Sequence, residues 1–258
     1  MPWEASRTLD PDLALGRALD GALAPWKRAT EPFTLLFSGG VDSGLLAFEL
    51  GAAPGFRALT LGRPGSRDLS AAERVAGQLG LAWSAHVVSD DELARLDGRL
   101  ADELDTAPPA LRGVFLALGA ALGASTTTEV LLGQGADELF LGYAHFRGLR
   151  CEEAAARAEE DLRRLLEEDW PRTVRLARAL GRQVTAPYLS PAFREAALAI
   201  PIGERLPAPE SKRYFRQWAA RRGLPDAVAH RPKVALQYGT GVARWLRAAS
   251  QRPGAPAR

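Results

Sequence analysis

The chain has 258 residues, of which 47% are hydrophobic and 25% charged, a composition typical of a soluble globular protein with one large or two small domains. Its apolar stretches are too short to span a bilayer, and its first residues lack the pattern of a secretion signal. The single cysteine, Cys151, excludes an intramolecular disulfide and a Cys-x-x-Cys metal site. We therefore expect a cytoplasmic protein without a membrane anchor.

The formal net charge of +2 hides an uneven distribution. Residues 181–258 hold 14 Lys and Arg against 4 Asp and Glu, whereas residues 1–180 hold 19 against 27. A basic C-terminal third would help to hold the phosphates of a nucleotide, and it would equally suit nucleic acid. For most of these arginines we favour a third interpretation, in which they form a solvated surface.

The hydrophobic pattern predicts an amphipathic helix over 7–30, followed by strands and helices in alternation. The expected strands are 33–37, 57–62, 85–88 and 130–132. The expected helices are 43–51, 68–79, 90–104 with Ser89 as its N-cap, and 108–122 with Gly123 as its stop. This alternation is typical of a doubly wound parallel α/β sheet, which binds ligands at the carboxyl ends of its strands.

From about residue 143 the pattern becomes helical. The expected helices are 151–168, interrupted at Pro171, and then 172–181, 191–200 and 211–222. We expect a disordered tail over 246–258, because its last eight residues include two prolines and a glycine. The chain is thus divided into a helical lead-in over 1–30, one domain over 31–245 and the tail.

A Gly-rich loop at residues 38–43, Ser-Gly-Gly-Val-Asp-Ser, directly follows the first predicted strand and opens a helix. Its glycines let backbone N–H groups approach an anion, and Ser38, Ser43 and the helix N-terminus supply further donors. Asp42 would repel a phosphate unless a cation lay between them, so it implies Mg²⁺. The loop predicts a cradle for metal-bound phosphate; the alternative is a Gly-rich turn with capping side chains.

A second Gly-rich loop follows the fourth predicted strand and reads Gly-Gln-Gly-Ala-Asp-Glu over 133–138. Like the first loop, it delivers acidic residues to the carboxyl edge of the sheet. Asp137 would meet Asp42 across the cleft, which gives two carboxylates for Mg²⁺ bound to a triphosphate. The alternative is an ordinary acidic pair, Asp137 and Glu138, at a helix N-terminus.

Together these motifs resemble those of a known family. The first loop resembles the PP-loop of ATP pyrophosphatases, and residues 133–143 resemble the Gly-x-Gly-x-Asp-Glu-Leu-Phe-x-Gly-Tyr signature of the asparagine synthetase family. Residues 62–69, 211–216 and 224–233 resemble further motifs of that family. The resemblance covers about residues 31–245, and it implies an adenine nucleotide alpha hydrolase-like sheet with a helical C-terminal part.

The resemblance also implies a set of ligand-binding residues for ATP and Mg²⁺. The residues implied in holding the β,γ-phosphates are Ser38, Gly39, Gly40, Asp42 and Ser43. The remaining nucleotide contacts would come from Leu59, Gly133 and Gln134. The metal ligands would be Asp42 and Asp137.

In this family ATP activates a carboxylate as an acyl-adenylate, and an amine then displaces AMP. The resemblance implies that Lys212 and Lys233 contact the phosphates, with Lys233 stabilising the charge that develops during the reaction. Asp42 would be the third catalytic residue, because it binds the metal. Two lysines and Mg²⁺ would offset the repulsion between the two anionic reactants.

The sequence departs from the family pattern at several positions. Position 2 is proline, where glutamine-hydrolysing members carry a catalytic cysteine on a glutaminase domain. We therefore expect the nitrogen to come from free ammonia, a substrate amine or a separate amidotransferase subunit. Gln134 replaces a glutamate that can accept a proton, and a neutral amide cannot act as a base at pH 7. Changes at Gln183, Thr185 and Ser190 put aspartate in doubt as the substrate.

The leading hypothesis is an ATP-dependent, AMP-forming ligase that joins ammonia or an amine to a small-molecule carboxylate. One alternative is a PP-loop enzyme that modifies tRNA, although its thiolating members generally need paired cysteines. Another is a nucleotide-binding protein that has lost the chemistry at Gln134. We expect neither a nucleic-acid nor a membrane partner, and the sequence leaves a homo-oligomer open.

Overall fold

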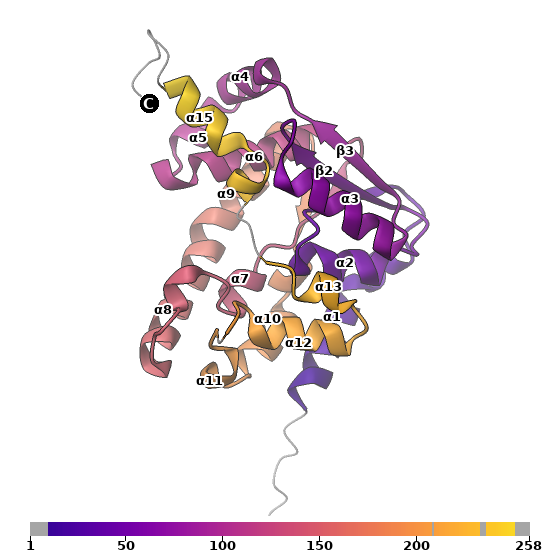
Figure 1. Cartoon of the computed structure of the whole chain (residues 1–258), viewed down its shortest axis with the longest axis vertical. Helices are drawn as coiled ribbons and strands as arrows, with labels where there is room; N and C mark the ends of the chain where they lie inside the picture. Colours follow the sequence, from indigo (N-terminus) through magenta and orange to yellow (C-terminus); the bar gives the residue numbers. More distant parts are fainter. Residues whose placement is uncertain (1–9, 208, 233–235, 251–258) are drawn as a thin grey trace, which may run out of the picture.

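The computed structural model describes residues 10–207, 209–232 and 236–250. Within these residues, five strands form one sheet in the order β3-β2-β1-β4-β5, of which Figure 1 labels β2 and β3. The strands are β1 Phe33–Leu36, β2 Phe56–Gly62, β3 Trp83–Val87, β4 Glu129–Leu131 and β5 Gln183–Thr185. All neighbouring strands run parallel, which confirms the predicted fold class.

Helices cover both faces of this sheet, because its side chains alternate between two apolar cores. Leu131 contributes to one core, whereas its neighbours Val130 and Leu132 contribute to the other. The first core lies under α1 Pro11–Lys27, α2 Val41–Leu50, α3 Arg67–Leu79, α10 Pro191–Leu198, α12 Arg213–Arg221 and α13 Asp226–Ala229. The second lies under α4 Asp90–Arg99, α5 Ala101–Asp105, α6 Pro109–Ala124, α9 Trp170–Ala179 and α15 Val242–Ser250.

Local capping explains where several of these helices begin and end. The Ser89 hydroxyl accepts a hydrogen bond from the backbone N–H of Glu92 (3.1 Å), which confirms the predicted N-cap of α4. Gly80 ends α3 in the left-handed conformation that glycine adopts without strain. The predicted helix over 90–104 divides at Leu100, and α6 runs through Gly123, so the predicted stop there is wrong.

The sequence pattern predicts a purely helical C-terminal half, but the structure also contains a strand there. Its helices are joined by β5, which pairs with β4 through Leu131 and Thr185 and extends the sheet. A three-residue strand is too short to show a period of two, so the pattern does not reveal it. The remaining helices here are α8 Cys151–Arg164 and three single-turn helices, α7 Ala136–Leu139, α11 Ile202–Arg205 and α14 Leu236–Gly239.

Two further boundaries differ from the prediction. Pro171 interrupts no helix, because a π-helical segment, Leu165–Asp169, joins α8 to α9 and the proline lies in the first turn of α9. Residues 246–250 belong to α15, so the predicted tail begins too early, and residues 251–258 lie outside the described residues. None of the helices in the described ranges is long and apolar enough to cross a bilayer.

Ion pairs between the two ends of the chain explain part of the uneven charge distribution. Arg222 on α12 pairs with Asp20 on α1 (3.0 Å) and with Glu49 on α2 (2.6 Å). Arg216 is 2% exposed and donates to the carbonyls of Ala229 and Arg231. The expectation of a solvated surface is therefore wrong for these two arginines: Arg222 joins α12 to α1 and α2, and Arg216 joins α12 to α13 and to residue 231.

Candidate active site

A cavity of about 580 Å³ lies at the carboxyl ends of β1, β2 and β4. Its volume falls in the range of small-molecule sites, roughly 300–1,000 Å³. Both Gly-rich loops open into it because parallel strands place their carboxyl ends at one edge of the sheet. The predicted site residues that line it are Ser38, Gly40, Asp42, Ser43, Leu59, Gly133, Gln134, Asp137 and Lys212.

Hydrogen bonds within the first loop hold its two serines together. The backbone N–H of Ser38 donates to Oγ of Ser43 (3.1 Å), and the N–H of Gly40 donates to Oγ of Ser38 (3.3 Å). The carbonyl of Asp42 accepts a hydrogen bond from the hydroxyl of Tyr188 (2.8 Å), which comes from the segment after β5. The loop is thereby shaped before any ligand binds.

Gly39 is not among the residues that line the cavity. It has a φ of +67°, and a Cβ there would lie 3.1 Å from the carbonyl oxygen of Ala71 on α3. Only glycine accepts both the left-handed backbone and this close approach. In the structure Gly39 therefore packs the loop on α3, and its contact with a phosphate stays a prediction.

The two loops are in direct contact at Gly133. A Cβ on Gly133 would lie 3.2 Å from the Cβ of Asp42 and 3.4 Å from the backbone nitrogen of Ser43. These distances leave little room for a larger side chain. Glycine at this position therefore brings the second loop against the first.

Lys212 is the cation on which the two loops converge. Its Nζ lies 2.6 Å from both carboxylate oxygens of Asp42 and 3.0 Å from Oδ1 of Asp137. The residue is 1% exposed. Burial pulls the pKa of Lys212 down, but the charges of Asp137 and Asp42 outweigh it and raise that pKa above its usual value. Lys212 is therefore an ammonium ion between two carboxylates that are 95 residues apart in the chain.

The backbone of Lys212 is also unusual, with a φ of +56°. A left-handed conformation costs a residue with a side chain about 1 kcal/mol or more. The surrounding packing must offset this cost. Strained residues of this kind gather at functional sites, which fits the presence of Lys212 in the cavity lining.

The donor set suits Mg²⁺ bound to a triphosphate better than a metal held by protein alone. Within the described ranges, no group of three or more His, Cys, Asp or Glu side chains could hold a metal ion. Asp42 and Asp137 supply two carboxylates near one point. Mg²⁺ is commonly bound by one or two carboxylates together with substrate phosphates and water. The residues present therefore fit the cofactors that the sequence predicts.

Several cavity residues are not among the ligand-binding and catalytic residues predicted from the sequence. They are Thr60, Asp68, Glu138, Tyr143, His145, Arg157, Arg164, Arg216 and Arg231. Arg231 donates from its Nη1 to the carbonyl of Ser38 (3.0 Å), so it supports the first loop from the C-terminal segment. Its neighbour Lys233 lies outside the described residues, so its catalytic role stays a prediction.

Tyr143 and His145 follow the second loop and form polar pairs at the cavity wall. Burial and the charge of Glu138 raise the pKa of Tyr143 far above its usual value, so its hydroxyl stays protonated and donates to Glu138 (2.5 Å). His145 lines the cavity, and its Nε2 lies 2.7 Å from Oδ2 of Asp161. The only sequence signal that points to His145 is its position two residues after the signature at 133–143.

Asp68 in the first turn of α3 is a buried carboxylate at the cavity wall. It is 2% exposed, and burial raises its pKa to about 6, against a weaker opposing effect of Arg231. The folded state therefore binds a proton more tightly than the unfolded chain, whose Asp68 pKa is near 3.8. The protonated Asp68 makes its full contribution to stability below pH 3.8, and this contribution is lost as the pH rises through about 6.

Asp68→Asn is therefore expected to raise the free energy of unfolding at pH 7 by about 2–3 kcal/mol, because the amide needs no proton to be neutral. The gain should shrink as pH falls and vanish below about pH 4. Urea unfolding of both proteins between pH 4 and pH 8 measures it. A difference that does not change with pH would contradict the role given to burial.

The parallel sheet and the Ser-Gly-Gly-x-Asp-Ser loop after its first strand define a PP-loop α/β domain. An asparagine synthase family model matches residues 14–183 and 152–253. The chain belongs to the asparagine synthase family.

Individual relatives agree with this assignment. A Methanocaldococcus jannaschii protein named as a glutamine-hydrolysing asparagine synthetase is 29% identical over 270 residues, which cover 88% of this chain and 49% of that protein. Asparagine synthetase B of Escherichia coli is 25% identical, over 90% of this chain and 45% of its own length. The chain thus spans about half the length of these relatives.

Among solved structures, the chain resembles the NH3-dependent NAD synthetase of Campylobacter jejuni, with 19% identity and a TM-score of 0.38 over 67% of this chain and 92% of the other. It also resembles the U34-tRNA thiolase NcsA of Methanococcus maripaludis, with 16% identity and a TM-score of 0.41 over 95% and 80%. These similarities are too low to support an argument about function.

Proposed function

We propose that this protein is an ATP-dependent ligase that adenylates a carboxylate, releases pyrophosphate and transfers ammonia or an amine to the activated acid. One observation carries the proposal: the two Gly-rich loops meet in one cavity, where Asp42 and Asp137 share Lys212. This arrangement supplies backbone donors, carboxylates for Mg²⁺ and a buried cation at one point. Family membership supports the same class of reaction.

The residues meet the main physical difficulty of the reaction, which is that a carboxylate must approach a triphosphate of the same charge. Mg²⁺ held by Asp42 and Asp137 would neutralise part of the phosphate charge and stabilise the leaving pyrophosphate. Ser38, Gly40 and Ser43 would donate hydrogen bonds to the phosphates. Lys212 would offset the repulsion between the two carboxylates and add positive charge beside the phosphates.

Gln134 would contact the incoming nitrogen. It lines the cavity, and its Oε1 is buried with no hydrogen-bond partner among the described residues. A buried acceptor of this kind is normally satisfied, so a ligand N–H is the natural donor. Because an amide cannot take up a proton at pH 7, a second molecule of amine or a water would remove the proton released when the amide forms.

The test is ATP–pyrophosphate exchange measured with a panel of carboxylic acids. We expect exchange that depends on Mg²⁺ and on one class of acid, and we expect AMP to accumulate when ammonia or an amine is added. Ammonia, small amines and glutamine with a separate amidotransferase should be compared as nitrogen sources. Accumulation of ADP, or the absence of exchange with every acid, would contradict the proposal.

Two other functions remain as alternatives to this ligase. A tRNA-modifying enzyme should retain tRNA on a filter at physiological salt, whereas a ligase of small acids should retain little. The single cysteine argues against thiolation through paired cysteines in this chain. A nucleotide-binding protein without catalysis would bind ATP but release no pyrophosphate with any acid.

A further inference from the structure

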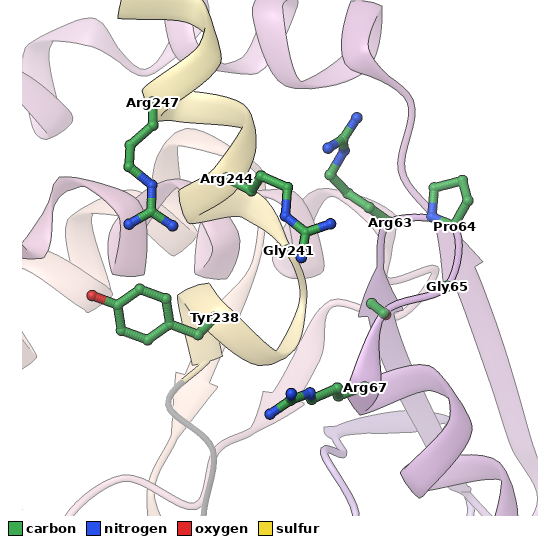
Figure 2. A pocket seen from close by; sticks show the side chains of 9 residues that line it. Arg63, Pro64, Gly65, Arg67, Tyr238, Gly241, Arg244 and Arg247 are labelled. Carbon is green, nitrogen blue, oxygen red and sulfur yellow. The ribbon is translucent and has the colours of Figure 1, made fainter.

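A second cavity, of about 310 Å³, lies between the loop after β2 and the C-terminal helices (Figure 2). Four arginines line it together with Tyr238: Arg63, Arg67, Arg244 and Arg247. Figure 2 shows Arg244 and Arg247 extending from α15 and Arg63 and Arg67 from the other wall. The cavity shares no lining residue with the first one.

Backbone hydrogen bonds fix the walls of this second cavity. The N–H of Arg63 donates to the carbonyl of Thr240 (2.9 Å), which joins the loop after β2 to the turn before α15. The N–H of Ser66 donates to the carbonyl of Arg63 (3.0 Å) and closes a turn with Pro64 and Gly65 at its centre. Gly65 has a φ of +70°, as the third residue of a type II turn requires. The arginines therefore extend from a defined frame.

The positive charge in this cavity is largely uncompensated. Arg63 forms an ion pair with Asp90, but no described residue forms an ion pair with Arg67, Arg244 or Arg247. Two polar atoms at the loop wall also have no hydrogen-bond partner among the described residues, Nε of Arg63 and Oγ of Ser66. Ser66 is 8% exposed, and as the N-cap of α3 it makes no side-chain capping bond.

We propose that this cavity binds the phosphate monoester of a small molecule. A phosphate monoester carries nearly two negative charges at neutral pH and three acceptor oxygens, which matches several guanidinium groups better than one carboxylate does. The positive end of α3 and the free Ser66 hydroxyl favour the same charge. The acidic residue in the first turn of α3, Asp68, lines the first cavity and not this one.

A small molecule fits these observations better than a nucleic acid does. The cavity is near the lower limit of small-molecule sites, roughly 300 Å³. Tyr238, 58% exposed, offers a flat surface on which a sugar ring can pack. Other arginines of the basic C-terminal third, such as Arg216 and Arg222, are held in internal contacts and do not extend the charged surface.

Isothermal titration calorimetry with ribose 5-phosphate tests the proposal, with ribose as the uncharged control. The titrations are made on the whole chain, with and without saturating α,β-methylene-ATP and Mg²⁺, because the first cavity also presents phosphate donors. We expect ribose 5-phosphate to bind in the presence of the analogue. The double variant Arg244→Gln/Arg247→Gln should weaken this binding at least about tenfold, since charge-assisted hydrogen bonds are lost.

A matched control variant removes two arginines that are also three residues apart on a helix, but outside this cavity. Arg175 and Arg178 on α9 are exposed and form no ion pair with the described residues, so Arg175→Gln/Arg178→Gln should bind ribose 5-phosphate like the unaltered chain. Arg67→Gln, on the opposite wall, should weaken binding without altering α15. Circular dichroism confirms that each variant is folded.

Four results would overturn the proposal: no binding, equal losses in both double variants, tighter binding of citrate than of ribose 5-phosphate, or tighter binding of a short RNA. Failure of the ligase hypothesis is distinguishable from all of these. It would appear as a lack of binding by α,β-methylene-ATP, or of acid-dependent exchange, while ribose 5-phosphate still bound.

Discussion

Asp42→Asn is expected to lower the rate of ATP–pyrophosphate exchange by about 10²–10³, the usual effect of removing one electrostatic group from a reacting centre. The substitution keeps the size of the side chain but removes the charge that would bind Mg²⁺. The fold should remain, because Lys212 keeps its ion pair with Asp137 (3.0 Å) and the hydrogen bond from Tyr188 goes to the backbone carbonyl of residue 42 (2.8 Å). Exchange kinetics and a thermal unfolding curve measure the two effects.

Asp20→Asn is the matched control for this substitution. Asp20 on α1 also accepts a hydrogen bond from a lysine, Lys27 (3.0 Å), but neither residue lines the cavity. We expect this variant to keep full exchange activity. An Asp42→Asn protein that exchanges pyrophosphate at the original rate would remove the metal role given to Asp42.

Lys212→Met is expected to destabilise the fold by about 2–3 kcal/mol and to lower exchange by at least about 10². Methionine fills the space of the aliphatic chain but leaves Asp42 and Asp137 facing each other without a cation. Removing one partner of a buried ion pair costs about 3–5 kcal/mol. We expect less because the two carboxylate side chains are 24% and 21% exposed, so solvent screens part of their repulsion.

Urea unfolding with and without Mg²⁺ tests the cause of this loss. Mg²⁺ should raise the unfolding midpoint of Lys212→Met more than that of the unaltered chain, because the two carboxylates no longer have an internal cation. Lys27→Met is the control: Lys27 also bridges two carboxylates, Asp20 (3.0 Å) and Glu49 (2.9 Å), outside the cavity. The Lys27→Met variant should lose under about 1 kcal/mol of unfolding free energy, and its unfolding midpoint should respond little to Mg²⁺. Equal Mg²⁺ effects on all three proteins would refute the explanation.

Residue patterns along the chain are enough to predict the alternation of strands and helices and the position of the two Gly-rich loops. These features are local: a strand, a glycine pair and the helix that follows lie within about a dozen residues, and their order implies a parallel sheet with both loops at one edge. The approach of Asp42 to Asp137 followed from that order. Family motifs drew attention to Lys212, but only as a residue that contacts phosphate.

Contacts between residues that are distant in the chain become visible only in the folded molecule. Lys212 reaches Asp42 across 170 residues, Arg222 reaches Glu49 across 173, and β5 joins the sheet from a segment that otherwise looks helical. The arginine-lined cavity likewise combines the loop after β2 with α14 and α15. Side-chain periodicity shows which face of an element is buried, but not which distant element covers it. That choice depends on how all the helices pack against the sheet at once.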